Sequence, residues 1–160
     1  MRESSLFCDM EPTHDFFLFN KKLDTFSALH KAGQNFNKVS FDDDFLNYIK
    51  DSLHWITVSQ GLSENAEKTN GLNMTGISVI DKKSARKLKA ILDGWIALFS
   101  EAPSMISLTT GCKAATEFQP GEIIRQAFHK RELLRSLVRL SEFCAQVNAN
   151  SKLCIVHLGL

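Results

Sequence analysis

The side chains best suited to recognition are arginines repeated along one predicted helix. Arg131, Arg135 and Arg139 are four residues apart, so they share one stripe of that helix, where like charges repel by roughly a few tenths of a kcal/mol per pair. The stripe either meets an acidic protein surface or phosphates, or forms a solvated face neutralised by the acidic N-terminal half. We expect a protein partner, because nucleic-acid-binding domains usually combine basicity with an aromatic platform. This chain has a pI of about 7.7 and one tyrosine.

A second group of basic side chains opens the helix predicted after Asp81. Cations in a first turn oppose the helix dipole, so local helix stability does not explain them. They therefore join the arginine stripe as candidate partner-binding residues. The group consists of Lys83, Arg86 and Lys87, with Lys82 and Lys89 beside them.

The sequence contains no recognisable catalytic or cofactor motif. Its five histidines and four cysteines lack the close pairing typical of structural zinc sites, and Cys154 and His157, three apart on a strand, would point to opposite faces. Nucleophile-elbow and phosphate-binding glycine patterns are missing. We expect no metal and no cofactor, and we favour a protein that is not an enzyme. The alternative is a small ligand-binding or hydrolytic domain whose site joins Glu122, His129 and His157.

Hydrophobic periodicity predicts two helices in the N-terminal part that help to position these residues. From Asp15 apolar residues recur at spacings of three and four, and Gly33 ends the pattern. A second helix is predicted from Ser40 or Asp42, because an N-cap residue and several acids lie in its first turn. The inner positions would be Phe16, Phe19, Leu23, Phe26 and Leu29 in the first helix, and Phe45, Ile49, Leu53 and Ile56 in the second.

From residue 74 onward, short β-like runs alternate with helical patterns. The predicted elements are a strand at 75–80, a helix at 81–99, strands at 105–109 and within 122–128, a helix at 130–147 and a strand at 153–158. This order is the split βαβ arrangement called ferredoxin-like. We therefore predict a single α+β domain over 1–160. It would have a helical part at 1–60, a linker at 61–73, and a small antiparallel sheet in ferredoxin-like βαββαβ order at 74–160.

Length and composition define the class of protein. A chain of 160 residues suits one domain, and its 44% hydrophobic and 23% charged residues are ordinary for globular proteins. No apolar run approaches the roughly 20 residues of a membrane helix. Acidic residues interrupt the N-terminus before a signal-peptide core could form. We expect a soluble, cytoplasmic protein with no membrane contact and with buried free cysteines.

Both tryptophans lie on apolar faces of predicted helices. Core packing is the expected role of Trp55 and Trp95. The alternative is that one of them anchors an interface, either with a partner or within a homo-oligomer.

Three segments in the C-terminal part carry a resemblance to a known class of proteins. They are residues 91–103 (ILDGWIALFSEAP), 106–111 (ISLTTG) and 156–160 (VHLGL). These segments resemble small bacterial immunity proteins, which neutralise secreted toxins. The resemblance implies a non-enzymatic inhibitor that binds a toxin domain and covers its active site, and it assigns no individual residue. Our first hypothesis is therefore an immunity-type protein that uses its charged surface for binding.

Overall fold

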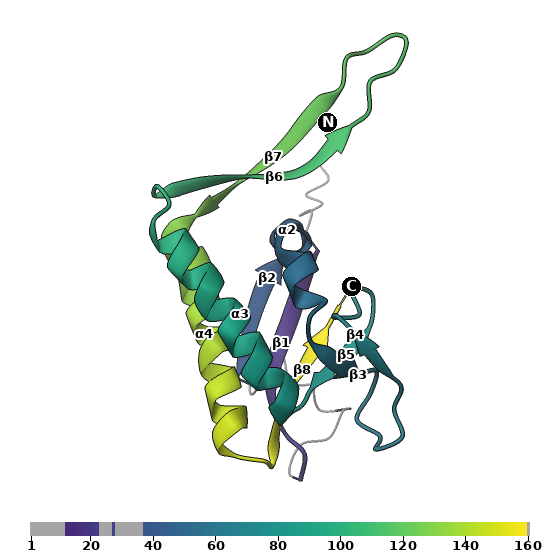
Figure 1. The fold of residues 1–160 in the computed structure, drawn as a ribbon, viewed down its shortest axis with the longest axis vertical. Helices are drawn as coiled ribbons and strands as arrows, with labels where there is room; N and C mark the ends of the chain where they lie inside the picture. The colour runs from purple at the N-terminus through teal and green to yellow at the C-terminus, as the bar shows by residue number, and fades with distance from the viewer. Residues whose placement is uncertain (1–11, 23–26, 28–36, 160) are drawn as a thin grey trace, which may run out of the picture.

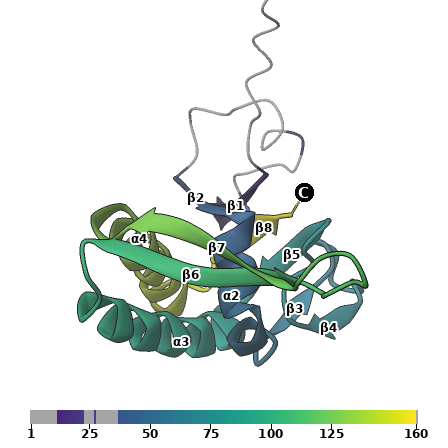
Figure 2. The ribbon, with the colours of Figure 1, turned by 90° about the horizontal axis from the view of Figure 1, so that it is seen from above.

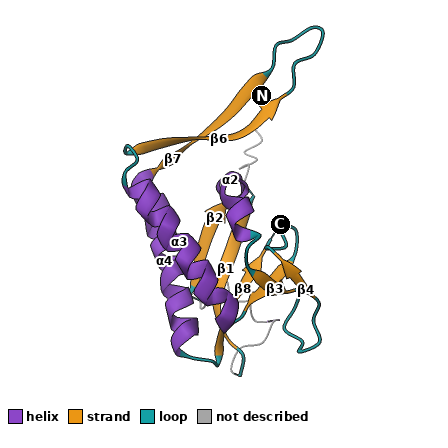
Figure 3. Cartoon of the chain, in the orientation of Figure 1, coloured by secondary structure: helices purple, strands orange, loops and turns teal. Residues whose placement is uncertain are grey.

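The computed structural model describes residues 12–22, 27 and 37–159 (Figures 1 and 3). This part of the chain contains three helices and eight strands. In chain order they are β1 (Thr13–Asn20), β2 (Lys38–Asp42), α2 (Asp43–Leu53), β3 (Thr57–Ser59), β4 (Lys68–Asn70), β5 (Ile77–Ile80), α3 (Lys82–Ser100), β6 (Met105–Lys113), β7 (Glu122–His129), α4 (Lys130–Ala149) and β8 (Leu153–Leu158).

Six strands form one antiparallel sheet in the order β2-β1-β8-β5-β3-β4. The C-terminal strand β8 lies near its centre, between β1 and β5. Helices α3 and α4 lie side by side on one face of this sheet, and α2 lies on the same side (Figure 2). Strands β6 and β7 form a separate two-stranded sheet.

The main core lies between the sheet and the three helices. Phe16 of β1, Leu88 of α3, Leu137 of α4 and Ile155 of β8 are all at most 1% exposed. Because side chains alternate along a strand, Phe17, Phe19, Val79, Cys154 and Val156 form a second buried cluster on the other face of the sheet. The central strands are therefore apolar on both faces.

The helix predicted from Asp15 is wrong where the structure describes it, because these residues form strand β1. Phe16 packs into the core beneath the helices, whereas Phe17 and Phe19 belong to the second cluster. A strand buried on both faces gives a continuous apolar run, which periodicity alone does not distinguish from a buried helix. The rest of that predicted helix, apart from residue 27, lies outside the described residues.

The ferredoxin-like order with two additional N-terminal helices is also wrong. Strands β6 and β7 follow each other as predicted, but they pair only with one another in the described chain. Strand β3 lies on the free side of β5, and β1 lies on the free side of β8. The described residues of the N-terminal part are therefore mixed and do not form a two-helix unit: they contribute β1, β2, β3 and the helix α2.

Several local predictions need smaller corrections. Helix α2 ends at Leu53, so the buried Ile56 follows it, and the predicted linker at 61–73 contains strand β4. Cys144 and Cys154 are buried, whereas Cys112 is exposed, and Cys8 lies outside the described residues. None of the helices within the described ranges is long and apolar enough to cross a membrane.

Two glycines give a matched test of this architecture. A Cβ at Gly159, whose N–H donates to the Gly76 carbonyl at 2.7 Å, would overlap the backbone of Met74, whereas a Cβ at Gly94 on α3 meets nothing within 4 Å. Gly159→Ala should lower the free energy of unfolding by about 1–3 kcal/mol, through forced backbone movement. Gly94→Ala should raise it by about 0.5–1 kcal/mol, because alanine favours a helix. Urea unfolding measures both, and equal effects would contradict the close approach at Gly159.

Candidate functional site

The β6–β7 hairpin is anchored to the body at its base and projects beyond it (Figure 1). Ile106 and Leu108 of β6 are 5% and 6% exposed. Phe128 of β7 lies with its ring centre 6.0 Å from that of Phe45 on α2. These buried contacts fix the direction in which the hairpin leaves the body.

Lys130 ties the end of the hairpin to the end of α3. Its Nζ donates to the carbonyls of Ser100 and Ala102, at 3.0 and 2.7 Å, and its backbone N–H donates to Ser104 at 2.9 Å. A cation near the C-terminus of a helix satisfies carbonyls that have no partner within the helix and opposes the negative end of the helix dipole. The base of the hairpin is therefore held by both apolar and charged contacts.

The outer half of the hairpin exposes large apolar side chains. Phe118 at the tip is 91% exposed, and Ile123 and Ile124 on β7 are 62% and 40% exposed. The tip is ordered by hydrogen bonds from the N–H groups of Phe118 and Gln119 to the hydroxyl of Thr116. Within the described chain the outer edges of β6 and β7 have no neighbouring strand. Free strand edges and exposed apolar side chains both favour contact with another protein.

The arginine stripe lies along the exposed face of α4. Arg131, Arg135 and Arg139 are all exposed, and with Leu134 and Val138 they line a shallow hollow of about 330 Å³. The predicted spacing therefore produces one basic surface.

Arg139 is the most constrained member of this stripe. Its guanidinium donates to the carboxylate of Glu142 and to the side-chain oxygen of Asn37, each at 3.2 Å, and lies 5.1 Å from the ring centre of Phe143. Arg131 and Arg135 form no ion pair with the described residues. Arg131 and Arg135 are therefore more available than Arg139 to bind a partner.

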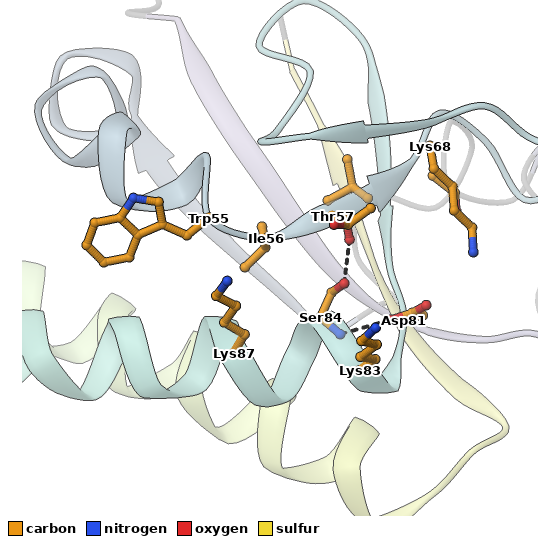
Figure 4. Close-up of a pocket in the computed structure, with 10 residues that line it drawn as sticks. Trp55, Ile56, Thr57, Lys68, Asp81, Lys83, Ser84 and Lys87 are labelled. Carbon is orange, nitrogen blue, oxygen red and sulfur yellow. Dashed lines mark hydrogen bonds between the residues drawn. The ribbon is translucent and has the colours of Figure 1, made fainter.

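The basic group on α3 divides between two environments. Lys83 and Lys87 line a cleft of about 380 Å³ between α3 and β3, with Lys68 of β4 at its far end (Figure 4). Arg86 is exposed but does not line this cleft. Asp81 accepts from the N–H of Ser84 at 2.9 Å, which caps the helix.

The two tryptophans differ in environment. Trp55 follows the end of α2 and is 62% exposed, so the expectation of core packing was wrong for it. Trp95 is half-buried: its Nε1 donates to the hydroxyl of Ser52 at 2.9 Å, and its ring stacks on Phe99 at 5.5 Å. The alternative role of interface anchor therefore concerns Trp55 and stays a prediction.

A buried chain of two histidines and an aspartate joins β1, β8 and α2. His14 Nε2 lies 2.8 Å from a carboxylate oxygen of Asp43, and His14 Nδ1 lies 3.0 Å from His157 Nε2. Because a carboxylate only accepts, His14 Nε2 donates to Asp43, so a neutral His14 accepts from His157 Nε2. His157 Nδ1 is buried without a hydrogen-bond partner among the described residues. Both imidazoles are 0% exposed, so a substrate at the surface does not reach them.

The alternative site of Glu122, His129 and His157 is not assembled. Glu122 and His129 are the two ends of β7, roughly 23 Å apart at about 3.3 Å per residue. His157 is buried in the other sheet. Among the described residues no group of His, Cys, Asp or Glu is placed to hold a metal ion.

Sequence reasoning missed the exposed apolar residues and the buried histidine pair. Phe118 stands in a polar turn before Gln119-Pro120-Gly121, where an aromatic side chain has no core to enter. That position was a usable signal. The approach of His14 to His157 depends on pairing between the two ends of the chain, for which the sequence carries no local signal.

Comparison with protein-family models, with curated protein sequences and with solved structures found no match to this chain.

Because His157 is buried, we expect the folded protein to lose stability in mild acid. Burial, followed by the neighbouring His14, lowers the pKa of His157 from 6.5 to about 3. The folded protein favours the neutral His157 ring, so the contribution of this ring to the free energy of unfolding is fully present above pH 6.5. It is lost between pH 6.5 and about 3, by up to roughly 1.4 kcal/mol per pH unit. Urea unfolding at several pH values measures this slope.

The pH dependence has a matched control. His157→Leu should lower stability at pH 7.5, because His14 loses its partner, but should flatten the slope between pH 6.5 and 5. His129→Gln, which removes an exposed histidine, should leave the slope at its wild-type value. An unchanged slope in His157→Leu would show that another group causes the acid sensitivity.

Proposed function

We propose that this chain is a non-enzymatic protein-binding domain that uses the projecting β6–β7 hairpin as its main contact. The observation that carries the proposal is the exposure of Phe118, Ile123 and Ile124 on a hairpin with two free strand edges. Their burial by a partner would contribute about 25 cal/mol for each Å² of apolar surface removed from water. The strand edges would add backbone hydrogen bonds and fix the direction of the partner.

The arginine stripe supplies a second, electrostatic part of this surface. Helix α4 begins directly after β7, so Arg131 lies two residues beyond the end of the hairpin. A basic stripe that continues from the hairpin base would steer an acidic partner toward the apolar tip. Charge would thus govern the association rate, and the apolar residues would govern the lifetime of the complex.

The specific form that we propose is an immunity-type inhibitor that binds and blocks a toxin domain. A narrow projecting hairpin with an aromatic side chain at its tip has the shape needed to enter the cleft of another protein. Inhibition by occlusion requires a complementary surface and no chemistry in the inhibitor. The decisive assay is the activity of the purified partner, which should fall to baseline at an equimolar ratio of this chain.

The hairpin contact is tested with a double variant. Phe118→Ser combined with Ile123→Thr should lower recovery of the partner at least about tenfold, because roughly 1.4 kcal/mol of lost apolar burial is enough for that change. Tagged chain added to native lysate, followed by quantitative mass spectrometry, measures the recovery. Both residues are exposed, so thermal unfolding should be unchanged.

The control for this experiment is Leu62→Ser, which removes an exposed apolar side chain outside the hairpin. It should retain wild-type recovery. Wild-type recovery by the double variant would contradict the hairpin contact. A mass that rises with concentration, with the chain itself as the recovered protein, would favour a homo-oligomer instead.

The arginine stripe has its own test. Replacing Arg131, Arg135 and Arg139 together with alanine should weaken partner binding and remove most of its salt dependence, because the steering charges are lost. Lys152→Ala, an exposed lysine outside the stripe, is the control. Association rates from surface plasmon resonance at low and raised salt give the readout, and an unchanged rate in the triple variant would remove the stripe from the proposal.

A further inference from the structure

A second surface unites the basic residues of α3 with the exposed tryptophan. Two hollows of about 380 and 520 Å³ lie along α3, and Trp55 and Lys87 line both of them. We call this combined depression the α3 groove. Between Lys83 and Leu98 it follows the helix for about 22 Å, at 1.5 Å per residue. It is therefore separate from the hairpin and from the arginine stripe on α4.

One end of the groove is positively charged. Lys83 and Lys87 line it from α3, and Lys68 faces the same hollow from β4 (Figure 4). None of the three forms an ion pair with the described residues. Asp81 also lines this end, and one of its carboxylate oxygens accepts the N–H of Ser84 as the helix cap, so three lysines face one carboxylate and positive charge is in excess. This end of the groove therefore suits a group with negative charge.

The other end of the groove is apolar. Ile91, Trp95 and Leu98 line it together with Gly94, whose missing side chain deepens it, and Leu98 is 59% exposed. Trp55, 62% exposed, lines both ends of the groove. An aromatic side chain bordering a concave apolar surface is a common anchor of protein interfaces.

The apolar floor is held rigidly before any ligand arrives. The Trp95 ring is fixed by its hydrogen bond to Ser52, by stacking on Phe99 and by an edge contact with Tyr48 at 5.9 Å. A surface that is already ordered loses little conformational entropy on binding. The groove is thus a preformed site.

We propose that the α3 groove binds an acidic protein segment that carries an apolar side chain. Charge complementarity selects the acidic residues, which would lie against Lys68, Lys83 and Lys87. The apolar side chain would enter the hollow between Trp55 and Leu98. A length of about 22 Å holds roughly six or seven residues of extended chain. The inference goes beyond the hairpin contact and does not depend on it.

Other polyanionic partners fit this geometry less well. The apolar hollow is shallow, so a bilayer would meet the exposed Trp55 and Leu98 but would supply no single side chain to fill the hollow between them. Nucleic acid would leave the apolar end of the groove without a partner. A short segment of protein supplies both charge and a single insertable side chain. Vesicles containing anionic phospholipid therefore serve as a competitor in the test.

The probe is a fluorescein-labelled synthetic peptide with glutamates at one end and leucine and phenylalanine at the other, titrated with the full chain by fluorescence anisotropy. Wild-type chain should bind it. Exchange of the glutamates for glutamine, or of the apolar residues for serine, should each weaken binding. Displacement of the peptide by anionic vesicles would overturn the proposal, as would failure of the wild-type chain to bind the peptide.

Matched variants locate the peptide. Lys83→Glu with Lys87→Glu should weaken binding about tenfold or more, and Leu98→Gln about fivefold, equivalent to roughly 1.4 and 1 kcal/mol. Arg131→Glu with Arg135→Glu reverses equally exposed charges on α4 and should stay within about twofold of wild type, since distant exposed charges are screened. An equal loss in the α4 variant would overturn the site. Phe118→Ser should bind the peptide normally, so failure of the hairpin proposal and failure of this one give different results.

Discussion

The pairing of β8 between β1 and β5 is the constraint on which the rest of the structure depends. The last strand of the chain bonds to the first described strand on one side and to β5 on the other. Cys154 to His157 are completely buried, so β8 is the most enclosed strand of the sheet. The segment between β5 and β8 therefore has to leave the centre of the sheet and return to it. Helix α3 carries the chain out, and α4 brings it back.

The histidine pair reinforces the register of this central pairing. His14 and His157 lie on adjacent strands and face the helices, where His14 also reaches Asp43 at the start of α2. A slip of one residue would turn every side chain of β8 to the opposite face. The two imidazoles would then separate: His157 would lose its one hydrogen-bond partner among the described residues, at a cost of about 1–3 kcal/mol, and His14 would keep only Asp43. The polar contact therefore penalises incorrect pairing more than it adds to stability.

The lengths of α3 and α4 explain why the β6–β7 hairpin is separate from the six-stranded sheet. At 1.5 Å per residue α3 and α4 are each about 30 Å long, whereas the neighbouring strand β5, with four residues, is about 13 Å long. The chain therefore turns from α3 to α4 beyond the end of β5 (Figure 1). Strands β6 and β7 pair with one another there and rest on α2 through Ile106 and Phe128. Their free edges follow from the length of the helices.

Local sequence signals predicted the C-terminal elements but not their arrangement. The helical and β-like patterns from residue 74 onward act within a few residues, and the helices and strands lie close to the ranges that these patterns predict. The topology depends on which strands pair beside β8, and that pairing joins segments that are distant in the sequence. The Phe16–Phe19 run pairs there as β1, although its apolar spacing favours a helix. In the same way, the spacing of Arg131, Arg135 and Arg139 predicted that they share one stripe, whereas the exposure of Trp55 required knowing that α2 ends at Leu53.

The exposed apolar residues separate the energetics of folding from those of binding. Phe118, Ile123 and Trp55 remain largely in water after folding, so they contribute little burial energy to the native state. A two-stranded hairpin is at best marginally stable by itself, and here the buried contacts of its base supply the stability that the tip lacks. The tip of the hairpin is therefore ordered although its own apolar side chains are not buried. That surface remains available to a partner, and because the tip is already ordered, most of the burial energy can appear as affinity.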